Sequence, residues 1–197
     1  LWAASGNTAL QANVWYFVSV TRTPDGATFY LNGVNDGSVV AGPDPWSPTA
    51  GVYIGRWYSV SSEFFSGLID EVRIYNRALG ADEIKRLYRI GATMKINKPL
   101  YTGSLTNGLV GAWTFDGPDM AGVTAYDRSG QGNNGTLTNG PTRGLGQLGQ
   151  ALSFDGVDDV IVAPDASSLE GMSAITISAW VYYKGGESYP RIVDKAP

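Results

Sequence analysis

Residues 66–75, SGLIDEVRIY, carry the clearest two-residue alternation in the chain and predict a β-strand. Successive side chains of a strand point to opposite faces of a sheet. The even-numbered residues therefore share one face of the sheet, namely Leu68, Asp70, Val72 and Ile74. The odd-numbered residues share the other face, namely Ile69, Glu71, Arg73 and Tyr75. The even face is apolar apart from Asp70, so a carboxylate is expected where the core should lie. A buried charge needs a partner such as an arginine or a metal cation.

A short amphipathic helix is predicted directly after this strand, at residues 81–88. Its residues Ile84, Leu87 and Tyr88 fall on one side at helical spacing. A helix of this length is unstable alone in water, so we expect that side to dock against a sheet. Gly80 is an acceptable N-cap for it.

Further strands are predicted wherever β-branched and aromatic residues are dense between turn signals. They occupy residues 15–21, 27–31, 34–40, 52–57, 109–116, 175–183 and 191–195. Asn32-Gly33 is a strong hairpin signal, because a type I′ turn needs positive φ at both of its central positions. Residues 89–107 mix polar residues, glycine and proline with few periodic apolar positions, and we expect a linker there.

The composition favours an all-β fold and excludes several kinds of site. The 197 residues suit one large β domain or two small ones, and 26 glycines with 10 prolines suit short strands joined by tight turns. A net charge of −4 argues against nucleic-acid binding. The absence of cysteine and histidine excludes disulfides, zinc thiolate sites and the commonest catalytic base. No apolar run is long enough to span a membrane, and any signal peptide is expected upstream of Leu1.

Four segments carry motifs that occur together in one family. GLIDEVRIYNRAL and the DEIKRLY that follows it (67–88) resemble the segment that closes LamG-like domains of the concanavalin A-like jelly-roll family. Residues 15–34 resemble the middle of such domains. YDRSGQGNNGTL (126–137) and ALSFDGVDDVIVA (151–163, a hairpin) resemble motifs of their N-terminal part. The resemblance implies an antiparallel β-sandwich, a concanavalin A-like jelly roll, with one short helix.

These segments come in the reverse of the family's order. Residues 1–88 are similar to the C-terminal half of a LamG-like domain and residues 108–197 to its N-terminal half, with the linker 89–107 between them. The chain could hold the tail of one tandem domain and the head of the next, or one permuted domain. Because an uncovered sheet is unstable, we expect the halves to complete one sandwich, within a chain or between neighbouring chains. Between Pro197 and Leu1 about one strand is missing compared with the family, which leaves an edge that another chain could fill.

Asp127 lies in a loop rich in glycine and asparagine, and such loops offer hard cations carboxylate, amide and carbonyl oxygens together. LamG-like domains often bind a structural calcium, and the resemblance implies one here, with Asp127, Asn134 and Asp70 as ligands. Asp70 is included because its strand and this loop lie near each other in the family sandwich. The alternatives are an Asx-turn at Asp127 and a salt bridge from Asp70 to Arg128 or Arg191.

Asp155, Asp158 and Asp159 form an acidic triplet around a turn. Paired carboxylates can hydrolyse glycosides, and some relatives of this superfold are glycosidases with an E-x-D-x-x-E strand. That strand is missing from the sequence, and no alternation aims two acids into one cleft. We therefore expect a turn with solvated charges, and no enzyme activity.

Aromatic residues near strand ends and loops are the candidates for ligand binding, because aromatic faces stack on sugar rings. Trp46, Trp57 and Tyr58 are the predicted ligand-binding residues, and Trp46 leads because Pro45 and Pro48 stiffen its loop. Packing in the core or at its rim is the alternative for each of them.

The predicted function is a non-catalytic binding or adhesion module outside the cell or at its surface. A glycan is the expected ligand class, by analogy at the level of the fold. The alternative is a structural subunit of a cell-surface filament or tandem assembly, joined through exchanged half-domains or an open strand edge. A third hypothesis is a glycoside hydrolase.

Overall fold

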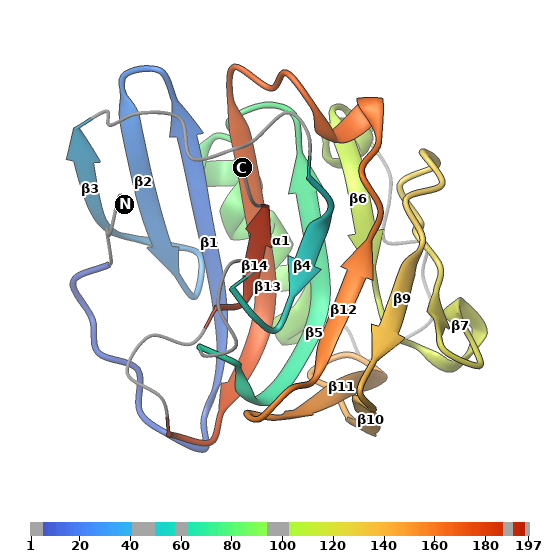
Figure 1. The fold of residues 1–197 in the computed structure, drawn as a ribbon. Coiled ribbons are helices and arrows are strands. Elements are labelled where there is room, and N and C mark those ends of the chain that lie inside the picture. The colour runs from blue at the N-terminus through green and yellow to red at the C-terminus, as the bar shows by residue number, and fades with distance from the viewer. Residues whose placement is uncertain (1–5, 41–49, 58–62, 94–102, 187–190, 196–197) are drawn as a thin grey trace.

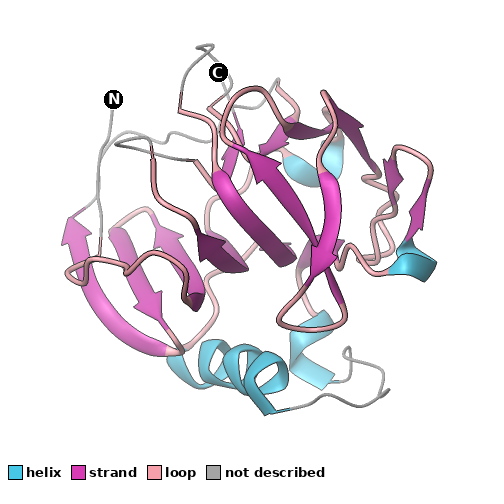
Figure 2. Ribbon diagram, turned by 90° about the horizontal axis from the view of Figure 1, so that it is seen from below, coloured by secondary structure: helices cyan, strands magenta, loops and turns pink. Residues whose placement is uncertain are grey.

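The computed structural model describes residues 6–40, 50–57, 63–93, 103–186 and 191–195. In these residues two antiparallel β-sheets pack face to face, and one helix lies along the outer face of the larger sheet (Figures 1 and 2). The all-β sandwich predicted from the sequence is thereby confirmed, and the arrangement is consistent with a jelly roll.

The larger sheet contains eight strands among the described residues, in the order β10-β11-β5-β13-β1-β2-β3, with β6 also paired with β5. Their bounds are β1 (Trp15–Thr23), β2 (Gly26–Leu31), β3 (Val34–Val40), β5 (Ser66–Tyr75), β6 (Leu109–Trp113), β10 (Thr142–Leu145), β11 (Gln150–Asp155) and β13 (Ile175–Tyr183). The predicted hairpin turn between β2 and β3 is confirmed, since Asn32 and Gly33 have φ values of 50° and 76°.

The smaller sheet contains six strands in the same described part of the chain, in the order β14-β4-β12-β9-β8-β7. Their bounds are β4 (Val52–Ile54), β7 (Met120–Ala121), β8 (Thr124–Ala125), β9 (Gly135–Thr138), β12 (Val160–Ala163) and β14 (Val193–Lys195). Three short 3₁₀ turns complete the elements: η1 (Gly103–Thr106), η2 (Gly117–Asp119) and η3 (Ser167–Leu169).

Strands from before and after residues 89–107 mix in both sheets. In the larger sheet β5 pairs with β13, and in the smaller sheet β4 pairs with β12 and β14. Early and late parts of the chain thus cover each other's apolar faces. The domain division at 89–107 and the reversal of the family order stay predictions.

Two hydrophobic cores lie on opposite faces of the larger sheet. The inner core, between the two sheets, includes Ile69 and Trp113. The outer core, between the larger sheet and α1 (Ala81–Thr93), includes Phe17 and Trp180. Because β5 is covered on both faces, its polar residues are buried together with its apolar ones.

The prediction that Asp70 shares a face with Val72 is wrong, because β5 contains a bulge. One extra residue of β5 lies between Asp70 and Arg73 in the register against β13, and Glu71 there has a φ of 55°. An extra residue reverses the alternation of faces. Val72 therefore belongs to the inner core, whereas Asp70 lies opposite Trp180, a residue of the outer core.

The helix docks against the larger sheet through the side that the sequence predicts. Ile84 and Leu87 are buried in the outer core, and the ring centres of Tyr88 and Trp180 are 5.6 Å apart. At the start of the helix, the Ile84 N–H donates a hydrogen bond to the Gly80 carbonyl at 3.1 Å. The predicted start and docking side are therefore confirmed.

The helix ends at Thr93, five residues after the predicted end at residue 88 and inside the segment expected to be a linker. Ile90 extends its apolar side onto the outer core. Gly91 allows the helix to approach Trp180 of the larger sheet closely, since a Cβ at this position would lie 2.1 Å from the indole Nε1 of Trp180. No helix in the described residues is long and apolar enough to cross a membrane.

Candidate functional sites

A groove opens where the larger sheet extends beyond the smaller one. β14 is the edge strand of the smaller sheet, and the inner faces of β13, β1 and β2 continue past it (Figure 1). The groove has a volume of about 430 Å³. Residues 191–193, at the start of β14, line it. Gly6, Thr8 and Leu10 also line it, from a segment whose Asn7 N–H donates to the Asp36 carbonyl in β3 at 2.7 Å. Concave sites of this size commonly hold small ligands.

Apolar side chains form the floor of the groove. Alternation along three paired strands brings six of them to the inner face: Val18, Val20, Phe29, Leu31, Ile177 and Ala179. All except Ala179 remain partly exposed. The sequence could not mark these positions as a ligand surface, because their alternation is the same as that of a covered core strand.

Polar and aromatic groups surround this floor. The Arg191 guanidinium carbon lies 5.3 Å from the centre of the Trp57 ring, and Arg191 Nε donates to the Glu63 carboxylate at 3.1 Å. Asp36, which also lines the groove, accepts hydrogen bonds from the backbone and hydroxyl of Thr8. The groove therefore has an apolar floor and charged groups at its walls.

Trp57 is the predicted ligand-binding residue that the structure places beside the groove. It is half-buried and stacks against Arg191, which lines the groove. Trp46 and Tyr58 lie outside the described residues. Arg191, which sequence reasoning considered only as a partner for Asp70, is the residue that connects Trp57 to the groove.

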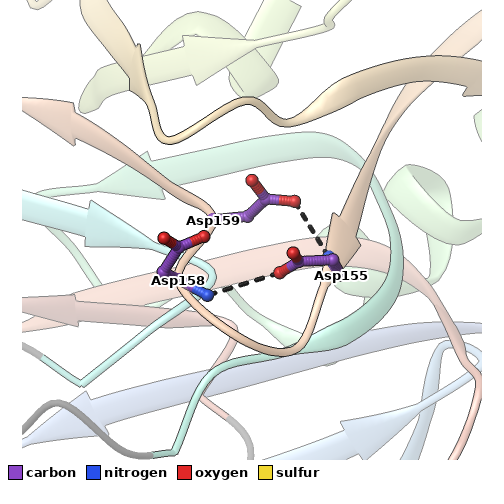
Figure 3. A group of neighbouring side chains, drawn as sticks. All are labelled: Asp155, Asp158 and Asp159. Atoms are coloured by element: carbon purple, nitrogen blue, oxygen red, sulfur yellow. Dashed lines mark hydrogen bonds between the residues drawn. The ribbon is translucent and has the colours of Figure 1, made fainter.

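The acidic triplet forms the turn between β11 and β12 (Figure 3). Oxygens of Asp155, Asp158 and Asp159 lie within 4.8 Å of one another. The Asp155 carboxylate accepts the N–H groups of Val157 at 2.8 Å and Asp158 at 3.3 Å, and Asp159 accepts the Asp155 N–H at 2.9 Å. These backbone hydrogen bonds lower the pKa of Asp155, whereas burial raises the pKa of Asp159. The predicted turn is confirmed and its carboxylates stabilise it, but only Asp155 and Asp158 are solvated as predicted, because Asp159 is buried.

Asp127 is satisfied within its own loop. Its Oδ1 accepts the N–H groups of Ala112 at 2.9 Å and Ser129 at 2.8 Å. Its Oδ2 accepts the Asn133 N–H at 2.9 Å and the Ser129 hydroxyl at 2.6 Å, and Asn134 Oδ1 accepts the Asp127 N–H. This is an Asx-turn extended to β6. Calcium binding by Asp127 and Asn134 stays a prediction, and four donors already occupy the carboxylate.

Asp70 has a different set of neighbours from Asp127. Its side chain is fully buried, and Oδ2 accepts the Leu148 N–H at 2.9 Å. Burial, reinforced by the nearby carboxylates of Glu71 and Asp116, raises the pKa of Asp70 well above its usual value. The structure therefore gives Asp70 and Asp127, the two carboxylates among the three predicted calcium ligands, separate hydrogen-bond partners.

The alternative for Asp70, a salt bridge to Arg128 or Arg191, is not formed among the described residues. Arg128 forms an ion pair with Asp119, and Arg191 pairs with Glu63 at 3.1 Å. The pairing of strands decides which charged side chains come together, and that pairing is a property of the tertiary structure.

Comparison with known proteins gives one match. Residues 2–85, which include the first five strands and the start of α1, match a laminin G-type family model described as the concanavalin A-like lectin/glucanases superfamily. No curated protein and no solved structure matches the chain significantly. Laminin G-like domains are generally non-catalytic and usually extracellular, while the superfamily also includes glycosidases.

Proposed function

We propose that this protein is a non-catalytic binding module, on the premise that residues 2–85 match the model of the concanavalin A-like lectin/glucanases superfamily. The observation that carries the proposal is the open groove over β13, β1 and β2. The proposed location is outside the cell or at its surface, which follows the usual location of laminin G-like domains.

Binding is favoured over hydrolysis by the groups that line the groove. Retaining and inverting glycosidases use two carboxylates across the scissile bond. Among the described lining residues Asp36 is the one carboxylate, and Thr8 already donates two hydrogen bonds to it. The acidic turn does not supply a second, because its residues are absent from the described lining.

A glycan is the ligand class that fits this groove best. Sugar rings combine apolar faces with hydroxyl edges, and the groove combines an apolar floor with Arg191 and Asp36 at its walls. The Trp57 ring adds an aromatic face beside Arg191. The lectins named in the superfamily description support the choice by analogy at the level of the fold.

A glycan array followed by titration calorimetry tests the proposal. The wild-type protein is expected to bind one group of related glycans, and Trp57→Ala is expected to weaken that binding about tenfold, or about 1.4 kcal/mol. Tyr126→Ala is the matched control, because Tyr126 is an exposed aromatic residue directly after β8, which lies near the opposite edge of the smaller sheet from β14 and the groove. Absence of binding across a broad glycan array, or an equal loss of glycan affinity in both variants, would contradict the proposal.

Self-assembly is the second candidate function, and the apolar floor beside β14 favours it. In the described residues β14 pairs with β4 on one edge, and an extended segment of a neighbouring chain could pair with the other edge. Such a segment would cover Val20 and its apolar neighbours on the floor.

Light scattering over a range of concentrations tests this second function. Assembly is expected to grow with concentration and to be lost in Val20→Lys, whose charge would lie in the groove. Val34→Lys is the control, since Val34 is exposed on the outermost strand β3. A wild-type protein that stays monomeric at the highest concentration rules out the assembly role.

A further inference from the structure

A second, smaller pocket lies at the end of the sandwich where β5 stops. Tyr75, the last residue of β5, pairs with Leu109 of β6 on one edge and with Thr176 of β13 on the other. The residue after β5, the start of β6 and the segment before β13 therefore come together there. The pocket has a volume of about 290 Å³, and no described residue lines both this pocket and the groove. A volume near the lower limit of ligand pockets suits one small molecule.

Polar side chains dominate the lining of this second pocket, so we call it the polar pocket. They belong to Asn76, Gln131, Ser167, Ser168, Glu170 and Ser173. The two larger apolar residues that also line it, Val110 and Met172, are 4% and 8% exposed. The polar pocket therefore offers hydrogen bonds rather than the apolar surface that the groove offers.

Buried Asn133 holds two walls of the polar pocket together. Its side-chain amide donates to the Val110 carbonyl at 2.7 Å and to the Ser168 hydroxyl at 2.9 Å, and its backbone carbonyl accepts from Trp113 Nε1 at 3.0 Å. These hydrogen bonds join the loop at residues 126–135, the start of β6 and η3, so the lining groups are positioned before a ligand arrives. Preorganised groups bind more tightly, because less conformational entropy is lost on binding.

Most of the polar groups on these walls are available to a ligand. Four exposed residues have side chains without a hydrogen-bond partner in the part of the chain that the structure describes, namely Asn76, Gln131, Ser167 and Ser173. Glu170 is half-buried and is the one charged residue of the described lining.

The donors and acceptors of the lining limit the ligands that fit. An ionised carboxylate only accepts hydrogen bonds, whereas a serine hydroxyl or a side-chain amide both donates and accepts. A ligand for this pocket must therefore offer donors to Glu170 and acceptors to the amide N–H groups of Asn76 and Gln131. A hydroxyl group does both at a single oxygen.

Charge and polarity argue against other ligand classes. Glu170 would repel an anion, and no basic residue of the described lining would offset that repulsion. One carboxylate supplies little charge for a divalent cation, whose affinity depends on the number of charged ligands. An apolar ligand would leave the desolvated hydroxyl and amide groups without partners, which weakens binding.

We propose that the polar pocket is a binding site for one neutral, hydroxyl-rich ring, such as a pyranose residue. The two oxygens of Glu170 accept hydrogen bonds from neighbouring hydroxyls of the ring, and the serine and amide groups bond to the remaining ones. The described lining contains no aromatic residue, so this ring is held by hydrogen bonds rather than by stacking. The inference does not depend on the ligand in the groove.

Backbone-amide NMR of the isotope-labelled protein tests the inference, with the methyl glycosides of glucose, galactose, mannose and N-acetylglucosamine as probes. At least one probe is expected to bind with a Kd on the order of 1 mM and to shift the amide signals of Ser167, Gly171 and Ser173. Cyclohexanol, a six-membered ring with one hydroxyl, is the matched control and is expected to leave these signals in place. No saturable shift of these signals with any probe, or an equal response to cyclohexanol, would overturn the proposal. Shifts confined to groove residues such as Val20 would support a groove ligand and overturn this second site.

Two substitutions show whether the lining residues bind the probe directly. Glu170→Gln keeps the size of the side chain and removes its charge, and it is expected to weaken binding about tenfold. Ser173→Leu, at an exposed position, is expected to fill the pocket and abolish binding.

Asp158→Asn is the control for both substitutions. It removes an exposed charge from the turn between β11 and β12 and is expected to leave the Kd unchanged. All three variants are expected to keep the Tm of the wild type within about 2 °C, because each change lies outside the core. An unchanged Kd in Glu170→Gln or in Ser173→Leu would overturn the proposal.

Discussion

The acidic turn and the ladder gap, which we define as the interval of β5 at Asp70 and Glu71 between its pairings with β11 and β6, each bring carboxylates together. Asp116 is the third carboxylate at the gap, and the two regions differ in what satisfies their carboxylates. In the turn, oxygens of Asp155, Asp158 and Asp159 lie within 4.8 Å of one another, and backbone N–H groups donate to the carboxylates of Asp155 and Asp159. Two of these three residues are exposed to solvent. In the gap, Asp70 and Glu71 are buried and each keeps an oxygen without a hydrogen bond.

The difference shows that close spacing of acids is a poor sign of a metal site. A turn can bring carboxylates together because each one caps the backbone beside it, and water screens the remaining repulsion. Burial without partners is more informative, since the protein bears that cost only where something offsets it. Three experiments test this contrast, from the largest expected effect to the smallest.

Gly149→Ala is expected to have the largest effect, because the new Cβ would lie 2.0 Å from Asp116 Oδ1 at a φ of +58°. We expect a loss of about 3 kcal/mol of unfolding free energy. Gly122→Ala is the matched control, with a φ of +57° and no heavy atom within 4 Å of the new Cβ. It should lose about 1 kcal/mol, from the backbone alone. Equal losses in urea unfolding would show that the gap does not need Gly149.

Asp155→Ala is expected to have an intermediate effect that calcium does not change. The substitution removes the acceptor for the N–H groups of Val157 and Asp158, which should cost about 1 kcal/mol. Asp158→Ala in the same turn is the control and should stay within about 0.5 kcal/mol of wild type, because Asp158 is exposed. If calcium stabilised wild type but not Asp155→Ala, the turn would be the metal site.

The pH dependence without calcium should show the smallest effect, with opposite signs in the two regions. The raised pKa values of Asp70, Glu71 and Asp116 mean that the folded protein binds protons there more tightly than the unfolded chain. Their contribution to stability therefore falls as pH rises from about 4, the unfolded value, through the raised folded values. The lowered pKa of Asp155 contributes stability above about pH 4, which is lost as pH falls through the folded value.

Urea unfolding of three EDTA-treated proteins across pH measures these signs. Compared with wild type, Asp70→Asn should lose less stability as pH rises above about 4, since one buried ionisation is removed. Asp155→Asn should differ from wild type chiefly above its own low folded pKa, where it lacks the stabilising charge. Superimposable profiles for wild type and Asp70→Asn would contradict the raised pKa at the gap.

The groove and the gap also show how far sequence reasoning reached in the candidate sites. Trp57 could be proposed as a ligand-binding residue because aromatic residues near strand ends are recognisable from the sequence alone. The groove floor was not found, because Val20 and its neighbours alternate like any core strand, and only the greater width of the larger sheet leaves them uncovered. Asp70 was recognised as a carboxylate in need of a partner, but its neighbours Asp116 and Gln150 were not.

The sequence by itself determined the elements whose signals are local. The strand at β5, the docking side of α1 and the Asn32-Gly33 turn follow from alternation, helical spacing and turn chemistry, each of which acts over a few residues. The end of α1 was misplaced because Gly91 stays helical through its contact with Trp180. That contact exists only in the folded protein.

The tertiary structure alone decided the bulge at Glu71 and the ladder gap beside it. A bulge depends on the register against β13, and the gap depends on where β11 ends and β6 begins along the same edge of β5. These pairings join residues far apart in the chain, so no local pattern encodes them. The carboxylate of Asp70 was visible in the sequence, but the face it occupies and the oxygens around it were set by which strands met.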